Sequence, residues 1–292
     1  MRFSLFGFYS NVYFLNPSLV ARLSCYGPIR SVDDLEITLQ VIVSATNNFS
    51  DENLIQKDEL GKYYKGQMFI SGHLTDIVAR RVGDTYVQIA GFWAEISMLD
   101  SLKHKNIVSI AGFCDEYDEK IIIYECTVHG HLDRHLFDAT NLTWIRRLKI
   151  CLGVAQALDY LHYDVVHCDI NNSKILLDED WEPKIFGFEY STKFPGSWNS
   201  WRHRLLSSNH FITSKYRDPS YIDTAIVTPK YDVYSFGVML FKVLCGRKAS
   251  VKDGVDQSLL EMAKRHFADK TLDDIIDKGL RKQMDLQSLN IF

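Results

Sequence analysis

The chain lacks the sequence patterns of several common functional classes. Its six cysteines occur singly, with no C-x-x-C pair and no metal-finger spacing, which indicates a reducing compartment. Its ten histidines form no H-E-x-x-H pattern, so a metal hydrolase finds no support. No stretch of the sequence approaches the ~18 consecutive apolar residues that a membrane-spanning helix needs.

The charge balance and composition are those of an ordinary globular protein. The 33 basic and 37 acidic residues give a formal charge of −4, which provides no general attraction to nucleic acid or to an anionic membrane. Of the residues, 46% are hydrophobic and 24% are charged, and no internal repeat or low-complexity segment occurs. A chain of 292 residues is long enough to bury one large domain.

One segment has the frame of a catalytic loop. Residues 167–178 have the sequence HCDINNSKILLD, which resembles the loop H-R-D-x-K-x-x-N of Ser/Thr protein kinases. The resemblance gives Asp169 the place of the base that accepts the proton of the substrate hydroxyl. Lys174 stands where the family has an Asn that ligates Mg²⁺. An ammonium group has three donors and no acceptor, so Lys174 cannot replace that ligand.

A second metal ligand of the family is also replaced. Residues 183–191 have the sequence PKIFGFEYS, which resembles the strand and turn that carry D-F-G, with Phe188 in register. Gly187 takes the place of the metal-binding Asp, and Glu189 the place of the Gly. Glu189 is either a substitute metal ligand, which would need a rebuilt turn, or a solvated carboxylate, which we favour. We therefore expect no normal magnesium-ATP chemistry.

The resemblance extends over most of the chain, from about residue 35 to residue 292. The local sequences resemble those of plant receptor-like kinases. Residues 45–55, ATNNFSDENLI, resemble the lead-in to their small lobe, and residues 232–238, DVYSFGV, match a helix of their large lobe. The resemblance implies an α+β, two-lobed protein-kinase-like fold. Its small lobe would hold a five-stranded antiparallel sheet plus one helix, and its large lobe would be mainly helical.

The implied domains are a small lobe over residues 35–124 and a large lobe over residues 125–292. Ser220 stands where the family has a Glu, and the Arg that pairs with that Glu would lie beyond Phe292, so we expect the last helices to be missing. Residues 1–34 form an extension, either a signal peptide or, as we favour, a disordered segment. Because no extracellular domain precedes the kinase-like part, we do not expect a complete receptor.

The nucleotide site is kept in part. Only the third glycine of the glycine loop, Gly61, survives, so this segment is a weakened phosphate loop or an ordinary hairpin. Arg80 replaces the phosphate-binding Lys; it either pairs with Glu95 and holds a helix inward without ATP, or both side chains are solvated. Tyr124 either limits the depth of the adenine pocket or is plain core. The resemblance places nucleotide contacts at Ile55, Gly61, Tyr63, Arg80, Glu95, Tyr124, Glu125 and Thr127.

Positions that hold the family's fold together keep its residues better than positions that carry out its reaction. His167 and Phe188 stand where the family stacks a hydrophobic spine between its lobes, with Leu99 as their neighbour, and Asp232 would anchor the backbone of the catalytic loop. Apolar spacing predicts helices over residues 132–136, 144–163, 259–267 and 272–276. It also places Phe92, Ile96 and Leu99 on one buried helix face.

A basic cluster lies between the two motif regions of the large lobe. It could receive an acidic or phosphorylated partner, although we favour a solvated loop. Its members are Lys193, Arg202, His203, Arg204 and Lys215.

We interpret the chain as a pseudokinase that acts as a signalling scaffold or regulator. ATP is the candidate cofactor, bound weakly or without metal, and Mg²⁺ is not expected. The expected partners are other receptor-like kinases or signalling proteins, in the cytoplasm or at the inner face of the plasma membrane, and no nucleic acid. Two alternatives stay open: a low-activity Ser/Thr protein kinase that uses Asp169 as base, and a relic of a kinase gene without a selected role.

Overall fold

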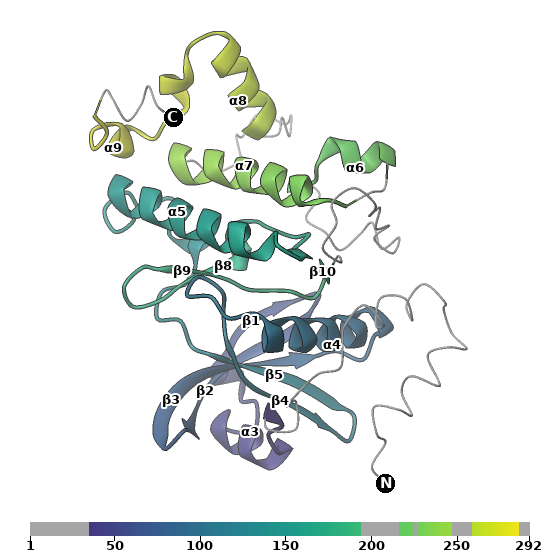
Figure 1. Cartoon of the computed structure of the whole chain (residues 1–292). Helices are drawn as coiled ribbons and strands as arrows, with labels where there is room; N and C mark the ends of the chain where they lie inside the picture. The colour runs from purple at the N-terminus through teal and green to yellow at the C-terminus, as the bar shows by residue number, and fades with distance from the viewer. Residues whose placement is uncertain (1–34, 194–215, 225–226, 247–258, 286–292) are drawn as a thin grey trace.

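The described residues form two lobes (Figure 1). The computed structural model describes residues 35–193, 216–224, 227–246 and 259–285. In Figure 1 the small lobe is coloured purple and blue, and the mainly helical large lobe runs from teal to yellow. The extension over residues 1–34 and four members of the basic cluster (Arg202, His203, Arg204 and Lys215) lie outside the described residues.

The small lobe is built on a five-stranded antiparallel sheet, as the sequence predicts. Its strands are β1 (Leu54–Asp58), β2 (Gly61–Ile70), β3 (His73–Val82), β4 (Ile110–Glu116) and β5 (Glu119–Glu125), in the order β1-β2-β3-β5-β4. The apolar run in β5 is buried on both faces of the sheet. Ile122 and Tyr124 belong to the main core, whereas Ile121 and Ile123 belong to a second cluster on the other face, since alternate side chains of a strand point to opposite faces.

A short helix, α3 (Leu39–Ala45), covers that second face and was not predicted from the sequence. Its one buried residue, Ile42, belongs to the cluster that contains Ile121. The helix approaches β2 so closely that a Cβ atom on Gly66 would lie 2.5 Å from the carbonyl oxygen of Ala45. Only glycine fits at this contact, because such a distance is a steric overlap.

Helix α4 (Tyr86–Ser101) packs on the first face of the sheet. Thr85 and Gln88 form a capping box at its N-terminus, which satisfies amide groups that the first helical turn leaves without partners. Phe92, Ile96 and Leu99 are fully buried. The helix face predicted from their spacing is therefore confirmed.

The large lobe is mainly helical, with short strands beside the cleft. Its helices are α5 (Trp144–Leu161), α6 (Pro219–Thr224), α7 (Pro229–Cys245), α8 (Leu259–Ala268) and α9 (Lys278–Arg281). Its strands are β6 (Gly130–His131), β7 (Val165–Val166), β8 (Ile175–Leu177), β9 (Pro183–Ile185) and β10 (Thr192–Lys193). Two predicted α-helices are instead the 3₁₀ segments η3 (Leu132–Arg134) and η6 (Leu272–Ile275), and α5 ends two residues before the predicted Tyr163.

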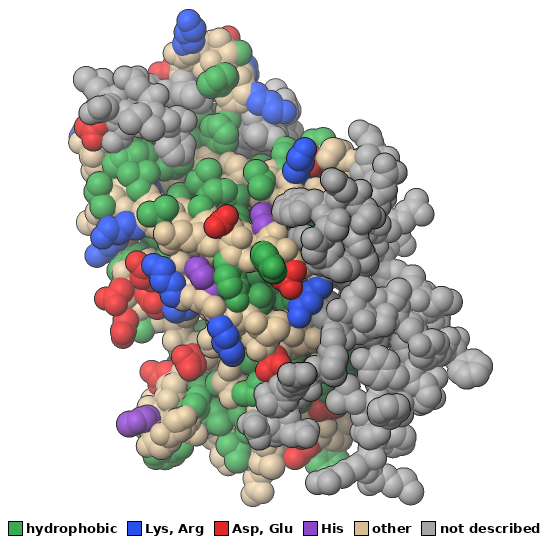
Figure 2. All heavy atoms as spheres, in the orientation of Figure 1, with side chains coloured by type: hydrophobic (Ala, Val, Ile, Leu, Met, Phe, Trp, Pro, Cys, Tyr) green, Lys and Arg blue, Asp and Glu red, His purple; other side chains and the backbone are tan. Residues whose placement is uncertain are grey.

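The surface shown in Figure 2 mixes charges of both signs, and hydrophobic side chains gather over α5 and α7. Ile145 and Leu152 of α5 and Val233 of α7 are each more than half exposed. Within the described residues, no helix combines the length and the apolar composition that crossing a bilayer requires.

Candidate nucleotide and metal site

The catalytic-loop backbone is fixed by a buried carboxylate from α7. Asp232 accepts hydrogen bonds from the amide of His167 at 2.7 Å and from the amide of Cys168 at 2.8 Å. Cys168 has a φ of 73°, a left-handed conformation that costs a non-glycine residue about 1–2 kcal/mol. Two hydrogen bonds to a carboxylate offset this strain. These are the contacts that the resemblance implies for Asp232.

The expected stack between the lobes is also present. The rings of His167 and Phe188 meet edge to face with their centroids 4.8 Å apart. Leu99 and Phe188 belong to the same buried apolar cluster, which joins α4 to the large lobe. The scaffold positions thus keep the arrangement that the resemblance implied.

Lys174 is buried and forms an ion pair at the position where the family ligates its metal. Its Nζ contacts Oε1 of Glu189 and lies 3.7 Å from Oδ2 of Asp169. Burial alone would lower the pKa of Lys174, but Glu189 and Asp169 outweigh it and raise the pKa above its ordinary value. Lys174 is therefore a fixed, buried cation.

The preferred interpretation of Glu189 as a solvated carboxylate is wrong. The residue is 2% exposed, because the turn directs its side chain inward to the ammonium group of Lys174. Burial alone would raise the pKa of Glu189, yet Lys174 and Arg80 outweigh it and lower the pKa. The carboxylate is ionised and occupied by an internal partner, which also argues against its use as a metal ligand.

The side chain of Lys174 fills the space next to Gly187 into which a side chain at position 187 would extend. A Cβ atom on Gly187 would lie 2.6 Å from Nζ of Lys174, and Gly187 has a φ of 84°. A side chain at position 187 would therefore overlap the lysine as it is placed here. Such a side chain would require the end of the Lys174 side chain to shift.

Arg80 links α4 to the same charged group. Its Nη2 lies 2.6 Å from Oε2 of Glu95, and its Nη1 lies 3.7 Å from Oε2 of Glu189. Both Arg80 and Glu95 are fully buried, so the expected ion pair forms and the solvated alternative is wrong. We call the connected residues the buried ion cluster: Arg80, Glu95, Asp169, Lys174 and Glu189.

This cluster pairs its carboxylates with its own cations. It contains two cations and three carboxylates, but the ammonium of Lys174 takes an oxygen of Glu189 and lies beside Asp169. Within the described residues, no three His, Cys, Asp or Glu side chains come together as a metal-binding group. The donor set present fits an internal cation better than a hydrated divalent ion, which needs several oxygen ligands.

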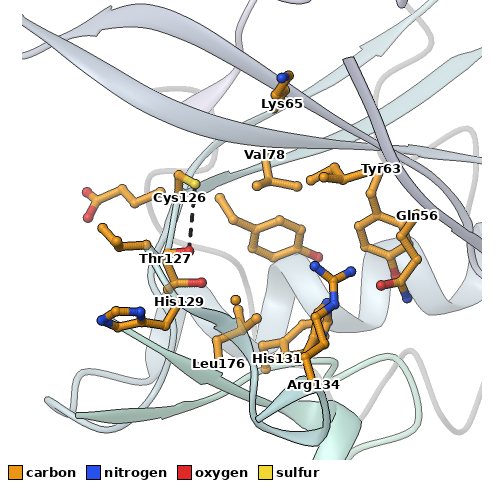
Figure 3. Close-up of a pocket in the computed structure, with 16 residues that line it drawn as sticks. Gln56, Tyr63, Lys65, Val78, Cys126, Thr127, His129, His131, Arg134 and Leu176 are labelled. Atoms are coloured by element: carbon orange, nitrogen blue, oxygen red, sulfur yellow. Dashed lines mark hydrogen bonds between the residues drawn. The ribbon is translucent and has the colours of Figure 1, made fainter. Parts of the chain in front are cut away.

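A pocket of about 250 Å³ lies beside the segment that joins the two lobes. Five predicted nucleotide contacts line it: Ile55, Tyr63, Tyr124, Glu125 and Thr127. Gly61, Arg80 and Glu95 are absent from its lining. Figure 3 shows Val78 above the pocket and Leu176 below it, with Arg134 reaching up from the large lobe towards Gln56 and Tyr63. The predicted site is thus divided into an open pocket and a separate charged end.

The backbone of this segment offers a hydrogen-bond donor to a ligand. The Cys126 amide donates to the carbonyl of Asp76 at 2.9 Å. The Thr127 amide has no acceptor among the described residues, and Thr127 lines the pocket. A flat heteroaromatic ring in the pocket could accept a hydrogen bond from it. Tyr124 is both core and pocket wall, since it is 3% exposed and lines the pocket.

Several residues of the site were not anticipated from the sequence. His131, Arg134, Leu176 and Phe186 line the pocket from the large lobe. The segment that contains His131 and Arg134 carries no distinctive local pattern in the sequence. Phe186 and Leu176 are adjacent to motif residues, which is the one signal that could have indicated them.

Comparisons with known proteins agree with this geometry. A family profile described as the protein kinase domain matches residues 76–285. The chain is 38% identical over 263 residues to a putative receptor-like protein kinase of Arabidopsis thaliana, covering 86% of this chain and 30% of that protein. It is 36% identical over 251 residues to the receptor-like protein kinase FERONIA of the same plant, covering 82% of this chain and 27% of that protein.

A further relative is the receptor-like protein kinase ANXUR2 of Arabidopsis thaliana, 36% identical over 270 residues, which are 87% of this chain and 30% of that protein. The chain spans about 30% of the length of these curated relatives. From the two-lobed fold, the matched domain and these relatives, we conclude that the chain belongs to the protein kinase family, among the receptor-like kinases of plants.

Proposed function

We propose that this protein is a pseudokinase, which keeps the kinase scaffold, transfers no phosphoryl group with Mg²⁺, and acts by binding other signalling proteins. The observation that carries the proposal is the buried ion pair between Lys174 and Glu189. It lies where the family uses two oxygen ligands to hold the metal that neutralises charge on the phosphoryl group.

Electrostatics and sterics both support this proposal. A positive unit charge about 4 Å from a cation is repelled by about 4 kcal/mol per unit charge at an effective dielectric constant of ~20. Moving Lys174 away would leave Glu189 buried without its closest partner, which is costly because an unpaired buried charge is strongly unfavourable. Metal binding therefore costs free energy in either case, through repulsion by Lys174 or through the loss of the partner of Glu189.

The remaining catalytic residue is poorly placed to act as a base. Asp169 is 4% exposed, its Oδ2 lies 3.7 Å from Nζ of Lys174, and its Oδ1 accepts a hydrogen bond from Nδ2 of Asn171 at 3.1 Å. A general base must reach the proton that it removes.

A second candidate function is a weak Ser/Thr protein kinase. The specific observation in its favour is that Asp232 holds the catalytic-loop backbone and that the Arg80–Glu95 pair is formed. Asp169 would be the base and Arg80 the phosphate contact. Phosphoryl transfer would then depend on Asp169.

We propose other receptor-like kinases or signalling proteins as the partner class, and the cytoplasm or the inner face of the plasma membrane as the location. The support is the family itself, since the relatives are named receptor-like protein kinases. The proposed ligand carries a base like that of ATP, which would lie in the pocket beside the Thr127 amide and would bind without Mg²⁺.

The test is a thermal-unfolding titration of the full chain with ATP, with and without MgCl₂, beside a phosphate-transfer assay on a generic protein substrate. A ligand at 100 times its dissociation constant stabilises by about 2.7 kcal/mol. We expect Mg²⁺ to add no stabilisation beyond that of ATP alone, and no transfer. Stabilisation that requires Mg²⁺, or transfer that Asp169→Asn abolishes, would contradict the proposal.

A reversion variant makes the test sharper. Lys174→Asn combined with Gly187→Asp and Glu189→Gly removes the internal cation and supplies both oxygen ligands of the family pattern. We expect this triple variant to gain stabilisation by ATP that depends on Mg²⁺. The matched control is Lys184→Asn, which removes a lysine of the partly exposed pair with Asp178 and should gain none.

A further inference from the structure

The turn between β1 and β2, residues 58–61, is docked across the cleft; we call it the hairpin tip. Leu60 is 8% exposed and belongs to a buried apolar cluster. All other members of that cluster lie in the large lobe: Val166, Cys168, Tyr190, Tyr221, Val227 and Tyr231. Because members of such a cluster are joined by side-chain contacts, Leu60 contacts the large lobe beside the catalytic loop.

Hydrogen bonds hold the hairpin tip in this position. Nε2 of Gln88, in the first turn of α4, donates to the carbonyl of Glu59 at 2.5 Å. Gln88 is itself held by the capping box with Thr85. Within the tip, Oδ1 of Asp58 accepts from the amide of Leu60 at 2.9 Å. The tip is therefore attached to α4 and to the large lobe at once.

The tip and the buried ion cluster together close the inner end of the cleft. None of the tip residues and none of the cluster residues lines the pocket. The cluster contains three carboxyl groups and two cationic side chains, and Asp58 and Glu59 of the tip are acidic. A phosphate chain directed inward would meet a closed end that has more carboxyl groups than cationic side chains.

The open pocket, in contrast, suits an uncharged ring. Tyr63, Val78, Leu176 and Phe186 line it. Burial lowers the pKa of His131, so this pocket residue is neutral at pH 7. Lys65 and Arg134 also line the pocket but are exposed, so water screens their charges and limits what they add to binding.

We propose that the docked hairpin tip restricts this pocket to ligands without an inward phosphate chain, so that its ligand class is an uncharged nucleobase or nucleoside rather than a nucleoside triphosphate. This inference rests on the proposed function, because it assumes a pocket that has been released from magnesium-ATP chemistry. Leu60 and Gln88 are then specificity-determining residues. They act by holding the tip in place, not by touching the ligand.

The test compares adenosine and ATP by isothermal titration calorimetry of the full chain in EDTA. We expect adenosine to bind at least about tenfold more tightly than ATP, which corresponds to about 1.4 kcal/mol. Leu60→Ala and, separately, Gln88→Ala release the tip and should reduce this ratio. The matched control is Leu74→Ala, at a leucine 58% exposed in β3 next to the β2–β3 turn, which should leave the ratio unchanged.

Tighter binding of ATP than of adenosine, or no binding of adenosine, overturns the inference. If ATP binds more tightly and Arg134→Ala abolishes the difference, the phosphates turn outward and the inference is likewise wrong. An unchanged ratio in both tip variants refutes the role of the tip, and Gln88→Ala keeps this arm valid if Leu60→Ala does not fold. This experiment contains no Mg²⁺. A result that overturns the inference therefore does not decide the proposed absence of magnesium-dependent phosphoryl transfer, which the titration with MgCl₂ tests.

Discussion

Lys174→Met probes the buried ion cluster most directly. Methionine is similar in length but uncharged, so the variant leaves Glu189 with Arg80, whose Nη1 lies 3.7 Å from Oε2 of that carboxylate. This remaining pair of unit charges still interacts by about 4.5 kcal/mol at an effective dielectric constant of ~20. Breaking a buried pair by removing one partner costs about 3–5 kcal/mol. We therefore expect the free energy of unfolding at pH 7 to fall by about 4 kcal/mol.

The loss should depend on pH with a defined sign. In the native protein the pKa of Glu189 is lowered, since Lys174 and Arg80 outweigh burial. Its contribution to stability is therefore present above the unfolded carboxyl pKa of about 4.3 and is lost as the pH falls. Without Lys174, burial dominates and the pKa rises, so the variant loses stability as the pH increases past about 4.3. The difference between the two proteins should be small near pH 4 and largest at pH 7.

Urea unfolding at several pH values measures this difference. Lys174→Met combined with Glu189→Leu should cost much less than the sum of the single changes, because it leaves no unpaired buried charge. Lys184→Met is the control, since it breaks a partly exposed pair with Asp178 and should cost less than about 1 kcal/mol. A loss below about 1 kcal/mol for Lys174→Met at pH 7, or one independent of pH, would refute the reasoning.

Buried groups elsewhere in the scaffold give three more expected outcomes, each measurable by urea unfolding. Asp232→Ala leaves two buried amides without their acceptor and should cost about 2–5 kcal/mol; Asp232→Asn, which keeps one acceptor, should cost less, and equal losses would contradict this. Arg147→Met removes a fully buried guanidinium that donates to backbone carbonyls and should cost about 3 kcal/mol, whereas a loss under about 1 kcal/mol would show that the guanidinium is dispensable. Gly66→Ala should destabilise the small lobe by about 1–3 kcal/mol, because its Cβ would overlap Ala45; the control Gly72→Ala, with open space but a φ of 84°, should show only backbone strain of about 1–2 kcal/mol.

The fold was predictable where a local pattern meets a general packing rule. The apolar run of β5 predicts a strand buried on both faces, and the spacing of Phe92, Ile96 and Leu99 predicts one buried helix face. Asp232 follows from its place in a specific string of the large lobe. Helix α3 was missed because it is short and only Ile42 is buried in it, so its apolar periodicity is weak.

The sequence predicted which metal ligands of the family are lost at the candidate site, but not which contacts the replacing residues make. The sequence by itself determined that Lys174 and Gly187 cannot ligate Mg²⁺, because the chemistry of a side chain does not depend on its surroundings for that conclusion. The tertiary structure decided that Glu189 is a buried partner of Lys174 rather than a solvated carboxylate. Fifteen residues separate the two, and no local pattern relates them.

The docking of Leu60 shows the same division. From the sequence, its segment is a hairpin with a degraded glycine loop, which a strand pattern on either side is enough to indicate. Its contact with the large lobe depends on how the two lobes meet. Helix and strand patterns arise from neighbours along the chain, whereas the charge pairs and the closed end of the cleft arise from groups that only folding brings together.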